Sequence, residues 1–325
     1  MAVAGRVVVL RALGLGDLLT AVPALRGLRR AYPGHRITLC TPAALTPLAQ
    51  LTGAVDEVHD ARPLEPLGDE LAGCDLAVNL HGRGPESHRV LESISPLATI
   101  AFRHPEVPWS LDGPDWLADE HEVLRWCRLL ESSGIAADPA DLHLELPDSA
   151  RDARLTLIHP GAASRSRRWP AERFAAVARD EEARGRSVLI TGGARERELA
   201  RRVAEMAGLR PGAVVAGGTS LLDLTRLVAR AGRLVCGDTG VAHLATALRT
   251  PSVLLFGPVS PAHWGPLDEE RHVVLWAGMT GDPHGGAADP GLLRIELEQV
   301  LEALDELDDR PFTGASSGAR IAHGV

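Results

Sequence analysis

Short runs of β-branched and other apolar residues alternate with longer amphipathic segments along most of the chain. This alternation is typical of βα units, in which helices connect and cover the strands of a parallel sheet. The clearest helix is expected over Leu18–Ala31, where apolar residues recur at helical spacing, and another over Trp116–Gly134. The strands expected in this first half are Arg6–Leu10, Arg36–Cys40, Val55–Val58, Leu76–Asn79 and Thr99–Ala101.

The alternation pauses in a passage rich in Pro and Asp, residues 136–154, and starts again at Leu155. Strands are then expected at Leu155–His159, Ser187–Thr191, Ala213–Val215, Arg233–Cys236 and Ser252–Phe256. The helices expected between and after them are Ala171–Arg184, Arg195–Ala207, Leu221–Ala231, Gly240–Leu248 and Pro290–Leu307.

This organisation predicts an α/β protein with two Rossmann-like, doubly wound domains that face each other across a cleft. The N-terminal domain is expected to span residues 1–145 and the C-terminal domain residues 146–312. Residues 313–325 form a Gly/Ser/Ala-rich tail with too little apolar content to fold, and we expect this tail to be disordered. Ligands of open parallel sheets bind beyond the carboxyl ends of the strands, so the strand-to-helix loops are the candidate site.

Composition narrows the possible functions. The 325 residues are 45% apolar and 24% charged, which excludes a wholly disordered or multispan membrane protein. A net charge of −9 argues against sequence-blind binding of nucleic acid. All 34 basic residues are Arg, so a Lys nucleophile, a Schiff base and a Walker-type lysine are excluded. The four cysteines and 13 histidines lack disulfide or metal-ligand spacing; we expect no metal site and a cytoplasmic location.

The first candidate loop, residues 11–17, follows the first strand and reads RALGLGD. Gly14 and Gly16 allow a tight turn and a close approach to a ligand. Asp17 stands where a phosphate would be repelled, so the loop is not a dinucleotide fingerprint. Asp17 is either the N-cap of the helix expected to begin at Leu18 or a carboxylate general base, and its position alone favours neither interpretation.

The second candidate loop, residues 159–170, reads HPGAASRSRRWP. Ser164, Arg165 and Arg167 lie at the end of a strand, where guanidinium groups can bind phosphoryl oxygens in a bidentate manner. The alternative is an ordinary solvated arginine run, with Pro170 in the first turn of the next helix. We favour an anion site here.

The third candidate loop, residues 236–243, reads CGDTGVAH. A helix that begins here would point the free amides of Thr239 and Gly240 at a ligand such as phosphate. His243 follows Thr239 by four residues and shares its helical face. The alternative makes Asp238 or Thr239 a simple N-cap and His243 a buried, hydrogen-bonded residue. A weaker signal is TGGARE, in which Gly192 and Glu196 belong to a glycine turn suited to a nucleoside.

Together these loops resemble those of glycosyltransferase family 9, the ADP-heptose heptosyltransferase family, over Arg6 to Pro266. The resemblance is carried by four stretches in the same order: GLGDLLTAVPALRGLRRAYP, HPGAASRSRRWP, TGGARE and CGDTGVAHLATAL followed by FGP. It implies a GT-B arrangement, with an acceptor in the N-terminal half and a nucleotide sugar in the C-terminal half. It also implies inverting transfer without a metal or another cofactor.

The resemblance assigns roles to individual residues. Asp17 corresponds to the proposed general base of the family. The residues implied in donor binding are Ser164, Arg165, Arg167, Gly192, Glu196, Thr219, Asp238, Thr239, Gly240 and His243. Those expected at the acceptor are Gly16, Asn79, His81 and Arg83. The alternative for His81 and Arg83 is a solvated loop after the strand that ends at Asn79.

We therefore expect an inverting, metal-independent glycosyltransferase that moves a heptose or a related sugar from a nucleoside diphosphate, ADP-heptose by resemblance. The alternatives are a non-catalytic nucleotide-sugar-binding protein and a sugar-nucleotide epimerase or hydrolase. The family's DLQG-like stretch reads Asn79-Leu80-His81-Gly82 here, which favours an acceptor smaller or less anionic than a phosphorylated lipopolysaccharide core, such as a natural-product sugar or another envelope glycan. Nucleic acid is not an expected partner and no transmembrane segment is expected, while contact with a membrane surface stays open.

Overall fold

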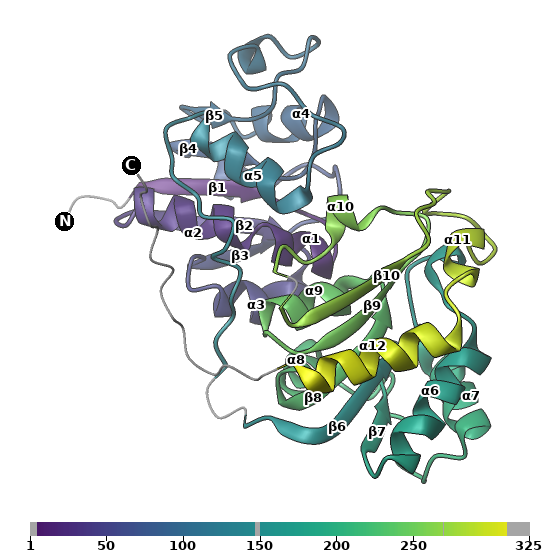
Figure 1. Ribbon diagram of the computed structural model, residues 1–325. Coiled ribbons are helices and arrows are strands. Elements are labelled where there is room, and N and C mark those ends of the chain that lie inside the picture. The colour runs from purple at the N-terminus through teal and green to yellow at the C-terminus, as the bar shows by residue number, and fades with distance from the viewer. Residues whose placement is uncertain (1–4, 147–149, 269, 311–325) are drawn as a thin grey trace, which may run out of the picture.

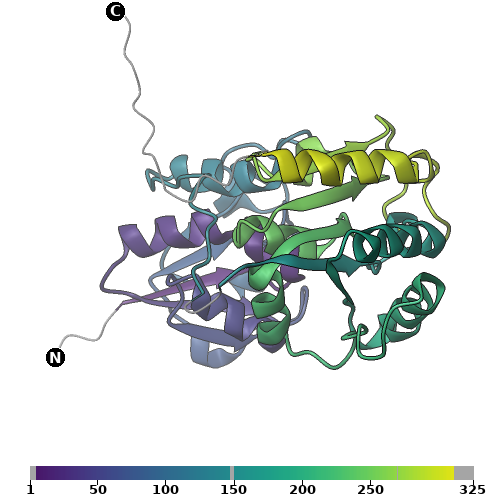
Figure 2. The same ribbon diagram turned by 60° about the horizontal axis from the view of Figure 1, so that its bottom comes forward.

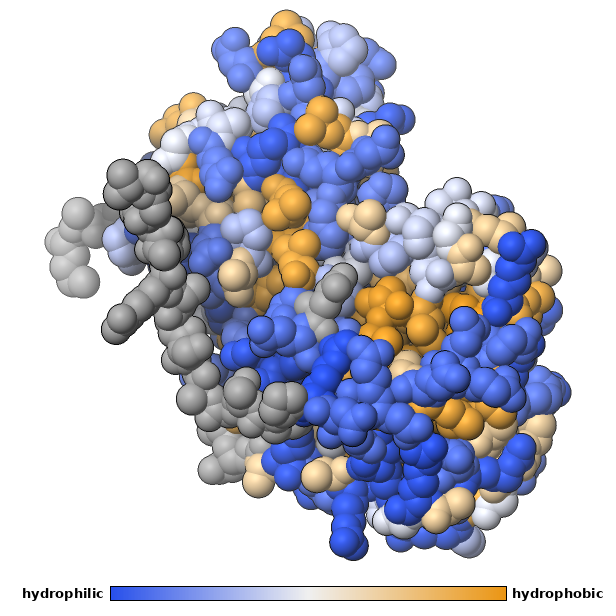
Figure 3. All heavy atoms as spheres, in the orientation of Figure 1, coloured by the Kyte–Doolittle hydropathy of each residue, from blue (hydrophilic) through white to orange (hydrophobic). Residues whose placement is uncertain are grey.

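A computed structural model describes residues 5–146, 150–268 and 270–310. It contains two five-stranded parallel sheets, each flanked by helices, one built from the first half of the chain and one from the second (Figures 1 and 2). This confirms the expected α/β fold with two Rossmann-like halves. The face drawn in Figure 3 is mostly hydrophilic, with smaller hydrophobic patches.

The first sheet has the order β3-β2-β1-β4-β5. Its strands are β1 (Arg6–Leu10), β2 (Arg36–Thr41), β3 (Glu57–Asp60), β4 (Leu76–Asn79) and β5 (Thr99–Ile100). Its helices are α1 (Leu15–Thr20), α2 (Val22–Ala31), α3 (Thr46–Leu51), α4 (Glu86–Glu92) and α5 (Glu122–Glu131). Val7, Val8 and Val9 of β1 are all fully buried, because helices cover both faces of this central strand.

The second sheet has the order β10-β9-β8-β6-β7. Its strands are β6 (Asp152–His159), β7 (Ser187–Ile190), β8 (Ala231–Gly237), β9 (Ser252–Phe256) and β10 (His272–Trp276). Its helices are α6 (Ala171–Ala183), α7 (Arg197–Ala207), α8 (Leu221–Arg230), α9 (Gly240–Ala247), α10 (Pro261–Trp264), α11 (Pro290–Leu293) and α12 (Leu297–Asp309). The last helix, yellow in Figure 1, packs against β9, β10 and α6.

Several expected elements differ from the structure. The helix expected over Leu18–Ala31 is two helices that meet at Ala21, because Pro23 in the first turn of α2 has no amide to continue α1. The helix expected over Trp116–Gly134 is only α5, which begins after its N-cap His121.

Two further expectations need correction in the second half. The helix expected over Pro290–Leu307 is divided into α11 and α12 by residues 294–296. The strand expected at Ala213–Val215 is reduced to one bridge between Val214 and Ile190. The tail expected at residues 313–325 lies outside the described residues. The domain boundary expected at residue 145 lies next to residues 147–149, which are also outside them.

The two halves meet where α1 packs against α9. Helix α1 follows β1 and α9 follows β8, so both begin at the carboxyl ends of central strands. One hydrophobic cluster runs through this junction and contains Leu19 from α1 and Leu244 from α9. The fold therefore places the first and third candidate loops against each other.

Candidate active site

Two glycines allow α1 and α9 to approach closely. A Cβ atom on Gly16 would lie 2.7 Å from Cδ2 of His243, and a Cβ atom on Gly240 would lie 2.8 Å from Cβ of Leu15. Both distances are too short for real side chains, so larger residues would push the helices apart. Gly16, expected at the acceptor, and Gly240, expected at the donor, are thus neighbours in the structure and pack across the junction.

Asp17 is the third residue of α1, and Gly14 is the N-cap. Oδ2 of Asp17 accepts a hydrogen bond from the Gly14 amide at 3.0 Å. The expected capping role is therefore present, but the helix begins at Leu15 rather than Leu18, and Asp17 caps it from inside the first turn. The side chain keeps 27% exposure, so the carboxylate can also meet a ligand.

Arg11 holds the backbone of Asp17 in place from the protein interior, a role that was not predicted from the sequence. Its guanidinium is fully buried and donates to the Asp17 carbonyl at 2.8 Å, to Thr20 Oγ1 at 3.1 Å and to Glu122 Oε1 at 3.0 Å. The guanidinium carbon also lies 4.6 Å from the centre of the Trp126 ring. An arginine directly after a buried apolar strand was the available signal, because such a charge needs partners in the interior.

Glu122 is the counterion that makes this burial possible. It accepts hydrogen bonds from Arg11, from Arg125 and from Nε1 of Trp126 at 3.0 Å. Burial alone would raise the pKa of Glu122, but the two guanidinium groups outweigh it and lower that pKa. Glu122 is therefore ionised at neutral pH and balances the charge of Arg11.

Asn79, expected at the acceptor, is fully buried at the end of β4. Its Nδ2 donates to Ser87 Oγ at 2.9 Å, and its Oδ1 accepts from the His81 amide at 2.9 Å. In this conformation Asn79 holds the loop in place and does not face the junction between the halves. The structure leaves His81 as the part of this stretch that is available to a ligand.

His81 is half-buried and lies within electrostatic range of Arg11 and Asp17. Burial and the Arg11 charge lower the pKa of His81 to about 4, against an opposing effect of Asp17, so the ring is neutral at pH 7. Its Nδ1 is buried and has no hydrogen-bond partner among the described residues. Arg83 is exposed, as expected for a residue in a solvated loop.

In the C-terminal half, Arg167 and Asp238, both expected at the donor site, form an ion pair. The Nη1 atom of Arg167 lies 3.1 Å from Oδ2 of Asp238. The Arg167 side chain is 26% exposed whereas that of Asp238 is 6% exposed. Nε of Arg167 is buried without a hydrogen-bond partner within the described part of the chain. Arg167 therefore keeps hydrogen-bonding capacity for an anion, and Asp238 orients it.

The other polar side chains of the loop at residues 159–170 differ in how many hydrogen bonds they already make within the protein. Nε and Nη2 of Arg168 donate to the Ala162 carbonyl at 3.1 and 2.8 Å, which commits Arg168 to the loop itself. Ser164 donates to the carbonyl of Pro283 at 2.6 Å and fastens the loop to that segment. Arg165 is exposed. The structure therefore favours Arg167 as the anion-binding residue of this loop.

The start of α9 matches the expected helix-terminus geometry. Thr239 is the N-cap, and its Oγ1 accepts from the Val241 amide at 3.2 Å. The first amides of the helix point outward beside Arg167, where they favour negative charge. His243 follows one turn later, and its ring packs edge-on against Trp264 with the centres 5.7 Å apart. Burial lowers the pKa of His243, so its imidazole is neutral at neutral pH.

The glycine turn after β7 packs against the buried end of β6. Glu196 Oε2 accepts from the Gly193 amide at 2.7 Å and lies 3.9 Å from Nε2 of His159. A Cβ atom on Gly161 would overlap the Glu196 carboxylate. Glu196 therefore fills space in this loop, and only part of its carboxylate faces outward.

Gly192 and Thr219 lie on adjoining loops of the second half. The Gly217 amide donates to the Gly192 carbonyl at 2.9 Å, which joins the two loops. Thr219 is half-buried and directly precedes Ser220, the N-cap of α8. The structure thus brings the loops of Gly192 and Thr219, two residues expected at the donor, next to each other.

One residue outside the expected set joins the two halves. His121 Nδ1 accepts from the Val123 amide at 3.2 Å, so its Nε2 carries the proton and donates to the Gly265 carbonyl at 2.9 Å. Burial lowers the pKa of His121 and keeps the ring neutral. No sequence motif marks His121, because the partner carbonyl comes from the other half of the chain.

The arrangement places the partly accessible Asp17 carboxylate on α1, which packs against α9, and the candidate anion-binding group is Arg167 with the start of α9. Within residues 5–146, 150–268 and 270–310, no group of three or more His, Cys, Asp or Glu side chains is placed to hold a metal ion. The same part of the chain contains no helix that is both long and apolar enough to cross a membrane. A base opposite an anion site is the layout that transfer from a diphosphate leaving group requires.

Comparison with known proteins supports this interpretation. Residues 117–283 match the family model of glycosyltransferase family 9 (heptosyltransferase). Lipopolysaccharide heptosyltransferase 2 of Salmonella typhimurium is 25% identical over 342 residues, which cover 90% of this chain and 95% of that protein. Lipooligosaccharide heptosyltransferase 2 of Haemophilus influenzae is 30% identical over 151 residues, or 44% of this chain and 43% of that protein. The chain thus matches less than half the length of this second relative.

Solved structures show the same fold. A glycosyltransferase family 9 protein from Veillonella parvula superposes with a TM-score of 0.77 at 24% identity, over 94% of this chain and 98% of that one. ADP-heptose lps heptosyltransferase II of E. coli gives a TM-score of 0.76 at 24% identity, over 93% of this chain and 98% of that one. The two halves therefore have the GT-B arrangement, and the match to the family model confirms the resemblance to glycosyltransferase family 9.

Proposed function

The chain belongs to glycosyltransferase family 9, and on that premise we propose that it moves a heptose or a related sugar from a nucleoside diphosphate to an acceptor hydroxyl. ADP-heptose is the proposed donor, because the family is one of heptosyltransferases and one relative of known structure is an ADP-heptose lps heptosyltransferase. The observation that carries the proposal is the packing of α1, which presents the 27%-exposed Asp17 carboxylate, against α9, whose N-terminus directly follows the Asp238 that pairs with Arg167.

In the proposed reaction the acceptor oxygen attacks the anomeric carbon from the Asp17 side and its proton passes to the Asp17 carboxylate. The bond between the anomeric carbon and the diphosphate oxygen breaks, and the electron pair leaves with the diphosphate. Arg167 and the amides of Thr239 and Gly240 stabilise the charge that develops there. Attack from the face opposite to the leaving group inverts the anomeric centre. These groups supply the positive charge, and we propose that no metal or other cofactor takes part.

We propose that Arg11 is a positioning residue in this reaction. It binds the backbone carbonyl of Asp17 at 2.8 Å, so it fixes the helix turn that presents the carboxylate. Because Glu122 balances the Arg11 charge, Asp17 is not its sole counterion.

For the acceptor we propose a glycan or natural-product hydroxyl that is less anionic than a phosphorylated lipopolysaccharide core. The support is His81, which lies within electrostatic range of Asp17. Its ring is neutral at pH 7, so it provides no positive charge to bind a phosphate. Arg83 is the exposed cation of the same loop. The four cysteines are free and buried, which supports the proposal of a cytoplasmic enzyme.

A binding protein without transferase activity is the second candidate. It is favoured by one observation, the hydrogen bond from the Gly14 amide to Asp17, because this gives the carboxylate a purely structural task. Incubation with ADP-heptose, with and without acceptor glycosides, tests both candidates by the release of ADP and the mass of the product. Release only in the presence of acceptor supports transfer. Release without acceptor indicates hydrolysis, and tight binding without release indicates a binding protein.

A further inference from the structure

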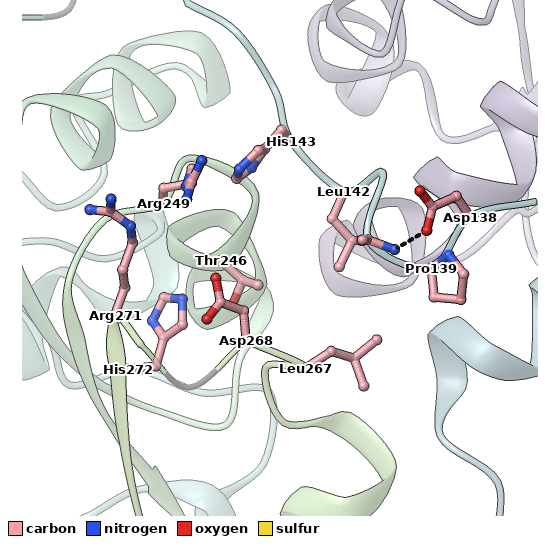
Figure 4. Close-up of a pocket in the computed structure, with 11 residues that line it drawn as sticks. Asp138, Pro139, Leu142, His143, Thr246, Arg249, Leu267, Asp268, Arg271 and His272 are labelled. Carbon is pink, nitrogen blue, oxygen red and sulfur yellow. Dashed lines mark hydrogen bonds between the residues drawn. The ribbon is translucent and has the colours of Figure 1, made fainter. Parts of the chain in front are cut away.

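A pocket of about 490 Å³ lies between residues 138–143, which connect the two halves, and the C-terminal half (Figure 4). It is lined by Asp138, Pro139, Ala140, Leu142, His143, Thr246, Arg249, Leu267, Asp268, Arg271 and His272. Its volume falls within the range typical of small-molecule sites. None of the residues expected at the donor or acceptor lines it.

The pocket is separate from the candidate active site. Thr246, which lines the pocket, lies near the C-terminal end of α9, whereas Thr239 and Gly240 lie at the other end of that helix. A helix of 8 residues is about 12 Å long at its usual rise per residue. His272 begins β10, so the pocket opens at the edge of the second sheet opposite to the carboxyl ends of its strands.

One side of the pocket is cationic. Arg249 and His143 lie near each other there, and Arg271 lies on the same side (Figure 4). Nε of Arg249 and Nδ1 of His143 are buried and have no hydrogen-bond partner in the described residues. The guanidinium of Arg249 also has no carboxylate within ion-pair distance among those residues. Arg249 is half-buried, and its inaccessible Nε donor is costly unless an acceptor completes it.

The backbone fixes Arg249 in this orientation. Arg249 has a left-handed φ of +54°, which is uncommon for a residue with a side chain. The Thr250 amide bonds to Ala245 at 2.8 Å, and Arg151 donates to the Arg249 carbonyl at 3.0 Å. The turn is therefore held from both sides, and its geometry presents the guanidinium to the pocket.

The remaining walls carry apolar side chains and two carboxylates, of which Asp268 lies within electrostatic range of Arg271 and His143. Leu142 and Leu267 stand across the pocket from the cationic side (Figure 4). The two acidic side chains each accept a backbone amide of their own loop: Asp138 from Ala140 at 3.0 Å and Asp268 from Glu270 at 2.9 Å. The pocket thus combines a cationic end with an apolar wall.

We propose that this pocket binds a small organic anion, with a phosphate or carboxylate head on Arg249 and an apolar body against Leu142 and Leu267. A guanidinium matches the planar pair of oxygens that either head group offers. Such a ligand contacts the connecting segment and the C-terminal half at once, so it raises the melting temperature of the native protein. The proposal does not depend on glycosyl transfer.

Three probes with one apolar body test it: 1-naphthyl phosphate, 1-naphthoate and the uncharged 1-naphthol, titrated calorimetrically into the full chain. At least one anion is expected to bind ten times more tightly than naphthol, and the comparison of the two anions identifies the preferred head group. Arg249→Gln is expected to remove this difference, while Leu267→Asp weakens all three probes. Arg210→Gln, at an exposed arginine far from the pocket lining, is the matched control and leaves binding unchanged.

Three results would overturn the proposal. Equal affinity for the three probes would show that no anion is recognised. Displacement of naphthyl phosphate by ADP, or its loss in Arg167→Ala but not in Arg249→Gln, would place binding in the candidate active site. Unchanged binding in Arg249→Gln and Leu267→Asp, with native circular dichroism, would place it elsewhere. None of these readouts uses transfer activity, so they are independent of the proposed function.

Discussion

Arg11 contacts Asp17 twice: its Nε donates to the Asp17 carbonyl at 2.8 Å, and its Nη2 lies 3.6 Å from Asp17 Oδ1. The contact to the carbonyl is a hydrogen bond that fixes the backbone of α1. The contact to the carboxylate is longer and leaves that group open to other partners. One buried cation therefore positions the proposed base without consuming its hydrogen-bonding capacity.

Asp17→Asn separates the two roles of Asp17. The amide oxygen of Asn can still accept the Gly14 hydrogen bond, but the side chain cannot take the acceptor proton. Transfer is expected to fall by about 10²–10⁴-fold, the usual contribution of a general base. Product formation is followed by mass spectrometry and nucleotide affinity by calorimetry. If turnover stays near the wild-type rate, Asp17 is only a capping residue.

Arg11→Met tests the buried support. The substitution leaves Glu122 as a buried carboxylate with fewer partners, and a broken buried pair typically costs about 3–5 kcal/mol. The free energy of unfolding, measured in urea, is expected to fall by this order. The double variant Arg11→Met/Glu122→Leu removes both charges and should recover much of the loss. Equal destabilisation in the single and double variants would contradict the pairing.

Arg167→Ala tests the donor side. Loss of a hydrogen bond to a charged group is expected to weaken nucleoside-diphosphate binding by about 1.5–3 kcal/mol. Asp238 would then face the diphosphate without its partner, which adds to the loss. Arg165→Ala is the matched control: Arg165 belongs to the same loop but is exposed. An unchanged affinity in Arg167→Ala, with a loss in Arg165→Ala, would reverse the assignment that the structure favours.

His272 makes folding sensitive to acid. Burial lowers the pKa of His272 to about 4 from its usual 6.5, while its Nδ1 bonds to Ser252 Oγ at 2.7 Å. The unfolded chain takes up the proton near pH 6.5 and the native chain only near pH 4, so stability is full above pH 6.5 and falls as the pH decreases between these values. The two pKa values correspond to a loss on the order of 3 kcal/mol.

His272→Asn keeps an acceptor for Ser252 but does not titrate. Urea unfolding at several pH values between 7 and 4 is expected to show a shallower loss of stability in this variant than in the wild type. Other buried histidines and the carboxylates contribute equally to both proteins, so the difference between the two curves isolates His272. Parallel curves would show that His272 titrates alike in the native and unfolded states.

The central strands could be predicted closely from sequence, because buried parallel strands are continuous apolar runs. The ranges expected for β1 and β9 agree with the structure residue by residue. Strand β10 was not predicted, since it lies at the edge of its sheet and most of its side chains are only half-buried. The apolar residues at 213–215 were mistaken for a strand, although only Val214 pairs with the sheet.

For the candidate site, the loops were predictable and the pairings were not. Gly16, Asp17, Arg167 and Gly240 lie in the strand-to-helix connections or the first helical turn after them, which the apolar pattern locates. The partner of Arg11, however, is 111 residues away on α5, and no local spacing encodes that contact. Likewise the family resemblance implied a role for Asn79 at the acceptor, whereas the structure buries Asn79 at the end of β4, where its side chain bonds to Ser87 and to the His81 amide.

The last prediction concerns the close approach of α1 and α9. Gly16→Ala would place a methyl group 2.7 Å from the His243 ring, and overpacking of this kind costs about 1–3 kcal/mol. Gly34→Ala is the control, because a Cβ atom there meets nothing within 4 Å. In a His243→Ala background the added methyl group has room, so the cost of Gly16→Ala should shrink by more than about 0.5 kcal/mol, beyond the additivity expected of independent sites. Urea unfolding of the four proteins in this cycle measures the coupling. Strict additivity would mean that Gly16 and His243 do not touch in solution and that the two halves stand further apart than in this structure.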